Sequence, residues 1–323
     1  MSRLFLGVDG GQSATIALIG DETGTVIGIG RSGPVNHVGA REGAERFRNA
    51  LAGCVGTGLH SAGLALGTQF EAACFGFSGG PQDKESLTRE IVPARLCSVT
   101  HDAMIALAGS AAGKPGVVVI AGTGSMGFGK NADGKTARAG GWGYTFGDEG
   151  GAFDIVRQAL RASVRAFEGW APRTALTDAL LEATGASDPH DILHRFYTEE
   201  FPRPRVASLA TTVDATACEG DQIAREILLG AARDLATLAG VVRTQLFQKG
   251  ESVLATWTGG VFRSAMLLER FKMLVELEDG VTAAPPVFEP AAGALIEAYA
   301  LAGLRPELKE VPREGSGGVE SGK

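Results

Sequence analysis

A chain of 323 residues is long enough for two domains, each with a hydrophobic core of its own. A formal net charge of −7 and the lack of any basic run argue against a nucleic-acid-binding surface. Glycine is unusually frequent, with 47 residues in the chain, whereas proteins on average contain roughly 7% glycine. These glycines gather where strands are expected to end, which predicts ligand-binding loops and tight turns.

Four cysteines are scattered along the chain, without a CxxC pair or a spacing typical of a metal site. Scattered cysteines are usually small buried side chains in a reducing compartment. The first apolar run, residues 4–8, is too short for a signal peptide or a membrane-spanning helix. We therefore expect a cytoplasmic protein with no membrane partner.

Strands are expected at residues 4–8, 14–19 and 25–30. The first ends at Asp9-Gly10-Gly11-Gln12-Ser13, a turn that could wrap around phosphates while Asp9 holds a hydrated magnesium ion. A plain hairpin turn explains this motif equally well. In the loop that follows, Asn36 and His37 could hydrogen-bond a polar small molecule, although loop Asn more often serves in turns.

An amphipathic helix at residues 40–55 and strands at 72–77 and 96–100 are expected next. Asp102 follows the last of these strands and precedes an Ala-rich helix. Asp is among the best N-capping residues, and position alone favours that role for Asp102. A carboxylate at this junction could instead accept a proton from a bound hydroxyl.

Pro115-Gly116 marks the expected domain boundary, after which the pattern restarts. A buried strand at residues 117–121 ends in Gly122-Thr123-Gly124-Ser125, and polar turns separate two further strands. Both halves therefore read as strand, Gly-rich turn, strand, polar turn and strand. This weak internal repeat predicts two similar domains with Gly-rich turns on both sides of a cleft.

Two more Gly-rich segments follow, Gly140-Gly141-Trp142-Gly143 and Gly147-Asp148-Glu149-Gly150-Gly151. Such glycines let backbone amides approach a ligand closely, and the nearby Trp and carboxylates suit a polar ligand. The chain is then mostly helical until a strand at residues 252–257 leads to Gly259-Gly260. Close approach by an adenine or ribose and an ordinary strand–helix turn are equally good explanations of that glycine pair.

Taken together, these motifs resemble the N-acetylglucosamine kinase and BadF-type ATPase family, within the actin, hexokinase and Hsp70 superfamily. The resemblance extends over nearly the whole chain, and the GTGS, GGWG and GDEG segments in that order are its most specific part. It implies an α/β fold of two ribonuclease-H-like (actin-like ATPase) domains around an interdomain cleft. We expect these domains at residues 1–114 and 115–305, the second with a helical insert, followed by a flexible tail at 306–323. Relatives also allow the last helix to pack on the first domain.

The resemblance further implies a role for each matched residue, with ATP and Mg²⁺ as cofactors. The expected cofactor-binding residues are Asp9, Gly10, Gly11, Gln12, Ser13, Thr123, Gly124, Gly259 and Gly260, and Asp9 holds the magnesium through water. The expected substrate-binding residues are Asn36, His37, Asp102, Ser125, Met126, Gly141, Trp142, Gly143, Tyr144, Thr145 and Asp148. Asp102 matches the catalytic base, which outweighs the N-cap explanation given by its position alone.

The implied activity is transfer of the γ-phosphate of ATP to the 6-hydroxyl of an amino sugar such as N-acetylglucosamine or glucosamine. Met126 stands where many amino-sugar kinases have Asn, so the sugar itself stays open, N-acetylmuramic acid and other hexoses included. An ATPase that activates or regulates another protein is the alternative in the same family. Activators hold an iron–sulfur cluster with cysteines, and the cysteine spacing here does not match that use. The expected partners are a small sugar and ATP, with a homodimer left open.

Overall fold

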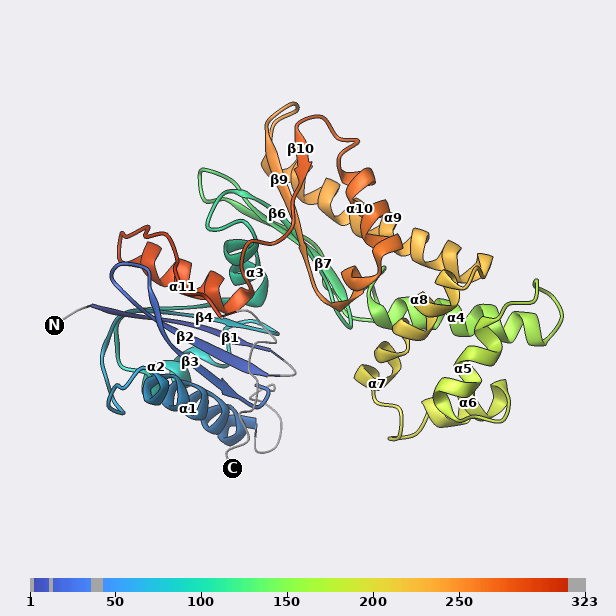
Figure 1. The fold of residues 1–323 in the computed structure, drawn as a ribbon, viewed down its shortest axis with the longest axis horizontal. Helices are drawn as coiled ribbons and strands as arrows, with labels where there is room; N and C mark the ends of the chain where they lie inside the picture. Colours follow the sequence, from blue (N-terminus) through green and yellow to red (C-terminus); the bar gives the residue numbers. More distant parts are fainter. Residues whose placement is uncertain (1–2, 12–13, 36–42, 313–323) are drawn as a thin grey trace. The chain divides into compact units, whose positions relative to one another are not determined.

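The computed structural model describes residues 3–11, 14–35 and 43–312 (Figure 1). The chain divides into two compact units, one of residues 1–114 with 285–323 and one of residues 115–284. Each unit is built on a mixed five-stranded sheet with helices, so the expected α/β class is confirmed. Within the described ranges, no helix is both long enough and apolar enough to cross a membrane.

The first unit contains β1 (Leu4–Gly10), β2 (Thr15–Asp21), β3 (Val26–Ser32), α1 (Gly43–Ser61), β4 (Phe70–Phe77), α2 (Glu85–Ile91), β5 (Ala94–His101), α3 (Asp102–Ser110) and α11 (Pro290–Leu301). The strand order is β3-β2-β1-β4-β5, with β2 antiparallel to both its neighbours and β1, β4 and β5 parallel. Alternate residues of β1 enter two separate cores: Leu6 packs in the core with α1, and Phe5 in the core with α11. Helices therefore cover both faces of the sheet, α1 and α2 on one and α3 and α11 on the other (Figure 1).

Glycines let α11 lie directly against β1 and α3. A Cβ added at Gly293 would overlap the backbone carbonyl of Ile105 in α3, and one at Gly7 would overlap the backbone of Leu295 in α11. At the end of α11, the Tyr299 hydroxyl donates a 2.6 Å hydrogen bond to the carbonyl oxygen of Asp21. The return of the chain to the first unit thus depends on backbone-to-backbone packing that only glycine allows.

Replacing Gly293 with Ala should destabilise the protein, by about 1–3 kcal/mol, because overpacking forces α3 and α11 apart. Gly240 in α9 is the matched control, since among the described residues no atom lies within 4 Å of its Cβ position. Ala at that helical site should instead stabilise the protein by about 0.5–1 kcal/mol. Urea denaturation of the two variants measures both effects, and equal stability of G293A and the wild type would show that α11 does not rest on α3.

The second unit contains β6 (Gly116–Ala121), β7 (Ser125–Lys130), β8 (Thr136–Gly140), α4 (Ala152–Phe167), α5 (Leu176–Thr184), α6 (Pro189–Phe196), α7 (Arg203–Ser208), α8 (Ala210–Cys218), α9 (Gln222–Leu246), β9 (Val253–Thr258), the 3₁₀ helix η1 (Gly260–Arg263), α10 (Ala265–Val275) and β10 (Val281–Ala283). Read from its other edge as β8-β7-β6-β9-β10, its strand order is that of the first sheet, β3-β2-β1-β4-β5, with β6 in the place of β1. The strand directions correspond as well. The internal repeat expected from the sequence is therefore a repeat of sheet topology.

The end of the chain returns to the first unit. Residues 285–305 were expected in the second domain, with the last helix allowed to pack on the first; they belong to the first unit, and α11 packs on its sheet. Residues 306–309, expected in a flexible tail, also join the first unit: Lys309 forms a β-bridge with Thr25, and its carbonyl oxygen accepts a 3.1 Å hydrogen bond from the Val26 amide. Burial of the neighbouring Leu308 side chain is the physical reason, because one apolar residue anchors an otherwise polar segment.

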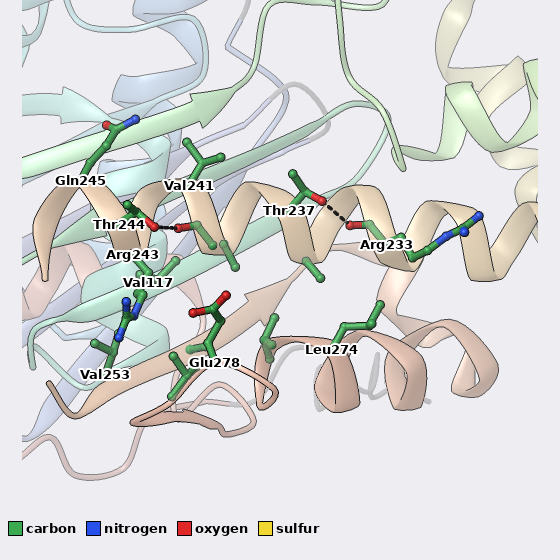
Figure 2. Close-up of a pocket in the computed structure, with 16 residues that line it drawn as sticks. Val117, Arg233, Thr237, Val241, Arg243, Thr244, Gln245, Val253, Leu274 and Glu278 are labelled. Atoms are coloured by element: carbon green, nitrogen blue, oxygen red, sulfur yellow. Dashed lines mark hydrogen bonds between the residues drawn. The ribbon is translucent and has the colours of Figure 1, made fainter. Parts of the chain in front are cut away.

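An open cavity of about 700 Å³ lies between α9 and α10 (Figure 2). Val117 and Val253, near the starts of β6 and β9, form part of its wall. Arg243 lines it as well and is 8% exposed; its guanidinium donates a 3.1 Å hydrogen bond to the carbonyl oxygen of Asp279, which fastens the loop before β10. The cavity therefore lies at the end of the sheet where β6 and β9 begin. The Gly-rich turns follow the opposite ends of these strands, where α/β sheets place their ligand-binding loops, so the cavity is separate from them.

Candidate active site

The carboxyl ends of three parallel strands meet at one edge of the first sheet. Gly10 of β1 is paired with Phe77 of β4, and Phe77 with His101 of β5. Asp9 is the penultimate residue of β1, and Asp102 comes directly after β5. The structure thus brings two of the predicted acids to the same edge, with β4 between their strands.

Asp102 is the first residue of α3, and its Oδ1 accepts a 2.9 Å hydrogen bond from the amide of Ala103. Burial of the carboxyl raises the pKa of Asp102 above its ordinary value. Hydrogen bonds from the Ala103 backbone and the Ser78 side chain and the charge of His101 lower that pKa without cancelling the rise. The N-cap position of α3 is occupied by His101, and its side chain makes no capping hydrogen bond within the described part of the chain. Asp102 is therefore a carboxylate with raised proton affinity at a helix start.

The turn after β1 is held by backbone hydrogen bonds and close packing. The amide of Gly11 donates to the carbonyl oxygen of Ala14 at 3.0 Å, and the amide of Val35 donates to that of Gly11 at 3.1 Å. A Cβ at Gly10 would overlap the Phe77 ring, so the turn passes where only glycine fits. Four predicted site residues lie outside the described residues: Gln12, Ser13, Asn36 and His37.

Three Gly-rich segments of the second unit converge where β6 and β9 end. These parallel strands are aligned at their ends, with Ile120 opposite Thr258. Gly259 has a φ of 108°, and a Cβ there would overlap the carbonyl oxygen of Ala121. Gly260 then begins η1. The predicted adenosine-binding glycines therefore lie directly beside the strand that leads into the GTGS turn.

The GTGS turn is fastened to the two Gly-rich segments that follow it. The Ser125 hydroxyl donates a 2.6 Å hydrogen bond to the carbonyl oxygen of Glu149. The amide of Phe153, in the first turn of α4, donates to the carbonyl oxygen of Thr123 at 3.1 Å, and the amide of Gly141 donates to that of Ser125 at 3.0 Å. Residues separated by up to 30 positions in the sequence are thus joined in one hydrogen-bonded unit.

An exposed aromatic loop continues from Gly141. Trp142 and Tyr144 are 67% and 48% exposed, and the guanidinium of Arg138 lies 4.9 Å from the centre of the Trp142 ring. The Met126 side chain lies beside Gly141, with its Cβ 3.2 Å from the position a Gly141 Cβ would take. The other predicted residues of this loop are Gly143 and Thr145. The loop therefore exposes two aromatic rings next to Gly141 and Gly143.

Asp148 is the buried acid of this group, at 5% exposure. A Cβ at Gly124 would overlap its carboxylate, so that carboxylate lies directly against the GTGS turn. Its Oδ2 accepts a 2.6 Å hydrogen bond from Nη2 of Arg203, the first residue of α7. Thr123, Gly124, Ser125 and Asp148 are thereby brought together within one unit.

The chain matches the model of the BadF/BadG/BcrA/BcrD ATPase family over residues 6–298. The chain belongs to this family. It is 31% identical over 281 residues to an N-acetylmuramic acid/N-acetylglucosamine kinase of Clostridium acetobutylicum, covering 85% of this chain and 91% of the relative. An N-acetyl-D-glucosamine kinase of Dictyostelium discoideum is 33% identical over 196 residues, which are 58% of this chain and 61% of that protein.

Solved structures of similar fold include a candidate N-acetylglucosamine kinase from Chromobacterium violaceum. It has a TM-score of 0.75 and 24% sequence identity, with 91% of this chain and 98% of that chain covered. Its likeness supports the fold, and the expected family and its two-sheet architecture are both confirmed.

The cysteines of this family member differ in burial. Burial raises the pKa of the Cys54 thiol to about 12, which disfavours the thiolate that binds metals. Cys74 is also buried, whereas Cys218 is exposed in the other unit. Across the described ranges, no group of three or more His, Cys, Asp or Glu residues could hold a metal ion.

The sequence analysis of this family member missed Arg203. A single arginine in a helical insert carries no motif, and its partner Asp148 lies 55 positions earlier in the chain. Ser78, which hydrogen-bonds Asp102, was likewise not among the predicted site residues. Neither contact follows from sequence spacing, because each joins residues that are far apart in the chain.

Proposed function

We propose that this protein is an ATP-dependent kinase that phosphorylates an amino sugar. The observation that carries the proposal is the Asp102 carboxyl, with its raised pKa, at the same sheet edge as Asp9 and the turn after β1. A carboxylate with raised proton affinity is suited to general-base catalysis. The kinase names of the two relatives support the same activity.

In the proposed reaction, Asp102 accepts the proton of the sugar 6-hydroxyl while that oxygen attacks the γ-phosphorus of ATP. The new bond joins the sugar oxygen to phosphorus, and the bond to the β,γ-bridging oxygen breaks and releases ADP. Phosphoryl transfer depends mainly on positioning and on stabilisation of negative charge. The protein therefore needs a fixed sugar, a fixed phosphate chain and a nearby base.

Backbone amides of the two Gly-rich turns would hold the phosphates, at Gly10 to Ser13 and at Thr123-Gly124. Gly259 and Gly260 would approach the adenosine closely. Asp9 is half-buried at the end of β1, and a single hard oxygen donor of this kind fits Mg²⁺ held through water. Magnesium would neutralise charge on the phosphates.

The sugar-binding residues we propose are Asn36, His37, Ser125, Met126, Gly141 to Thr145 and Asp148. Asp148 would accept hydrogen bonds from ring hydroxyls, and Trp142 would stack on the sugar ring. Met126 beside Gly141 gives an apolar wall where an amide would give a hydrogen-bond partner. This difference keeps N-acetylglucosamine, glucosamine and N-acetylmuramic acid all as candidate substrates.

Steady-state kinetics with a sugar panel tests the proposal. ADP release is measured with ATP, Mg²⁺ and each of N-acetylglucosamine, glucosamine, N-acetylmuramic acid, glucose and N-acetylmannosamine. We expect one or two amino sugars to raise ADP release by about 10²-fold or more over the rate without sugar, because a bound hydroxyl is a better-positioned nucleophile than water. ATP hydrolysis that no sugar accelerates would contradict the kinase and favour an ATPase that acts on another protein.

A further inference from the structure

Asp148 is held in an unfavourable backbone conformation. Its φ is 65°, in the left-handed region that residues other than glycine rarely adopt. Its side chain is nearly buried, and its carboxylate lies against Gly124. Surrounding contacts must compensate both the backbone strain and the burial of a charge.

Arg203 provides a charged partner for the Asp148 carboxylate. Its Nη2 donates the 2.6 Å hydrogen bond to Oδ2 of Asp148. Its guanidinium carbon also lies 4.9 Å from the centre of the Tyr144 ring and 5.9 Å from that of Phe153. Those two rings meet edge to face, with centroids 5.2 Å apart. One guanidinium therefore connects the buried acid to the aromatic loop and to the start of α4.

The other hydrogen-bonding atoms of Arg203 show what fixes its position. Its Nε is buried, and it has no acceptor in the part of the chain that the structure describes. A buried donor without an acceptor costs free energy. The position of the guanidinium is therefore set by its contacts with Asp148 and the two rings, and not by a hydrogen bond from Nε. Lysine could supply the positive charge, but it lacks the planar guanidinium that stacks on the rings and the fixed fork of N–H donors.

We propose that Arg203 is a positioning residue for the sugar: it fixes the Asp148 carboxylate and the Tyr144 ring in the geometry that binds the ring hydroxyls. The inference rests on the proposed sugar-kinase function and adds to it a residue outside the family motifs. Arg203 acts through Asp148, so its effect appears mainly in sugar binding.

The test is a double-mutant cycle of R203M and D148N, measured by sugar KM and kcat and by calorimetric titration of the sugar. R203M should raise the sugar KM and Kd by about 10- to 100-fold, the effect expected for loss of an oriented charged hydrogen bond. The KM for ATP should change less than the sugar KM, since the described contacts of the Arg203 guanidinium are to Asp148, Tyr144 and Phe153. R203K should fall between R203M and the wild type. The double variant should bind sugar no more weakly than D148N alone, because coupled residues are non-additive.

Arg205→Met is the matched control from the same helix. The Arg205 guanidinium stacks 4.2 Å from the Phe201 ring and donates to the carbonyl oxygen of Glu200, away from Asp148. R205M should keep the wild-type sugar KM within about twofold. The double variant, which leaves no unpaired buried charge, keeps the test valid where R203M alone folds poorly.

Three results would overturn the inference. The first is an unchanged sugar KM in R203M with normal turnover, which leaves the kinase function standing. The second is an additive loss in the double variant, which makes Arg203 independent of Asp148. The third is wild-type protein that binds no sugar in the titration, which would overturn both the inference and the proposed function.

Discussion

Replacing Asp102 with Asn should lower kcat for sugar phosphorylation by about 10²- to 10⁴-fold, the usual contribution of a general base. Asn has nearly the same shape and can still accept the hydrogen bond from the Ala103 amide, so the start of α3 should be preserved. ATP binding should be unchanged, because Asp102 is expected to contact the sugar hydroxyl alone. Single-turnover kinetics, with a separate titration of ATP, measures both quantities.

The raised pKa of Asp102 gives this prediction a second readout. The base must be ionised to accept a proton, so activity should fall as the pH drops through its pKa. Since burial raises that pKa, the acid limb of kcat/KM should lie above the value of about 3.9 for an ordinary Asp. The limb should be absent from the residual activity of D102N.

The same shift predicts the stability of D102N. A folded-state pKa above the unfolded value means that the ionised carboxyl is less favourable in the folded protein than in the unfolded chain. This cost is present at pH values above the folded pKa and disappears as the pH falls below the unfolded value. D102N should therefore be at least as stable as the wild type at pH 7. A D102N protein that is well folded and fully active would rule out the proton-acceptor role.

Replacing Gly124 with Ala should have the second largest effect. The added Cβ would overlap the Asp148 carboxylate, so either the GTGS turn or the Asp148 loop must move. We expect kcat/KM for the sugar to fall by about 10²-fold, the usual cost of misplacing a substrate-binding group by roughly 1 Å. Overpacking should also lower the free energy of unfolding by about 1–3 kcal/mol.

Gly122 in the same turn is the control for the stability part of this prediction. No described atom lies within 4 Å of the position its Cβ would take, so G122A should leave the free energy of unfolding within about 0.5 kcal/mol of the wild-type value. Urea denaturation compares the two variants. Equal stability of G124A and G122A would show that the Asp148 carboxylate does not lie against the turn.

The sequence alone predicted the parts of the fold that depend on local pattern. Buried β-branched runs such as residues 117–121 predicted central strands, and the stretch before residue 252 was correctly expected to be mostly helical, as the long helix α9 shows. Glycine clusters correctly marked the ends of β1, β6 and β9. These features share one cause, since each is encoded within a short stretch of chain.

Features that depend on distant contacts could not be predicted in this way. The three-residue strand β10 exists because β9 offers an edge to pair with, and its own sequence carries no strand pattern. The packing of α11 on the first unit depends on Gly7 and Gly293 meeting the backbones of other elements. The pairing of Arg203 with Asp148 likewise depends on a distant contact. It joins α7, which the apolar periodicity did not reveal, to the loop that the Gly-rich motifs predicted.

Analysis of the product by ³¹P and ¹³C NMR tests the central claim most directly. The protein is incubated with ATP, Mg²⁺ and the sugar from the panel that gives the fastest ADP release. The account predicts one phosphate per sugar, attached to the oxygen of carbon 6, in an amount equal to the ADP formed. Inorganic phosphate in place of a sugar phosphate, at the same rate with and without sugar, would contradict it.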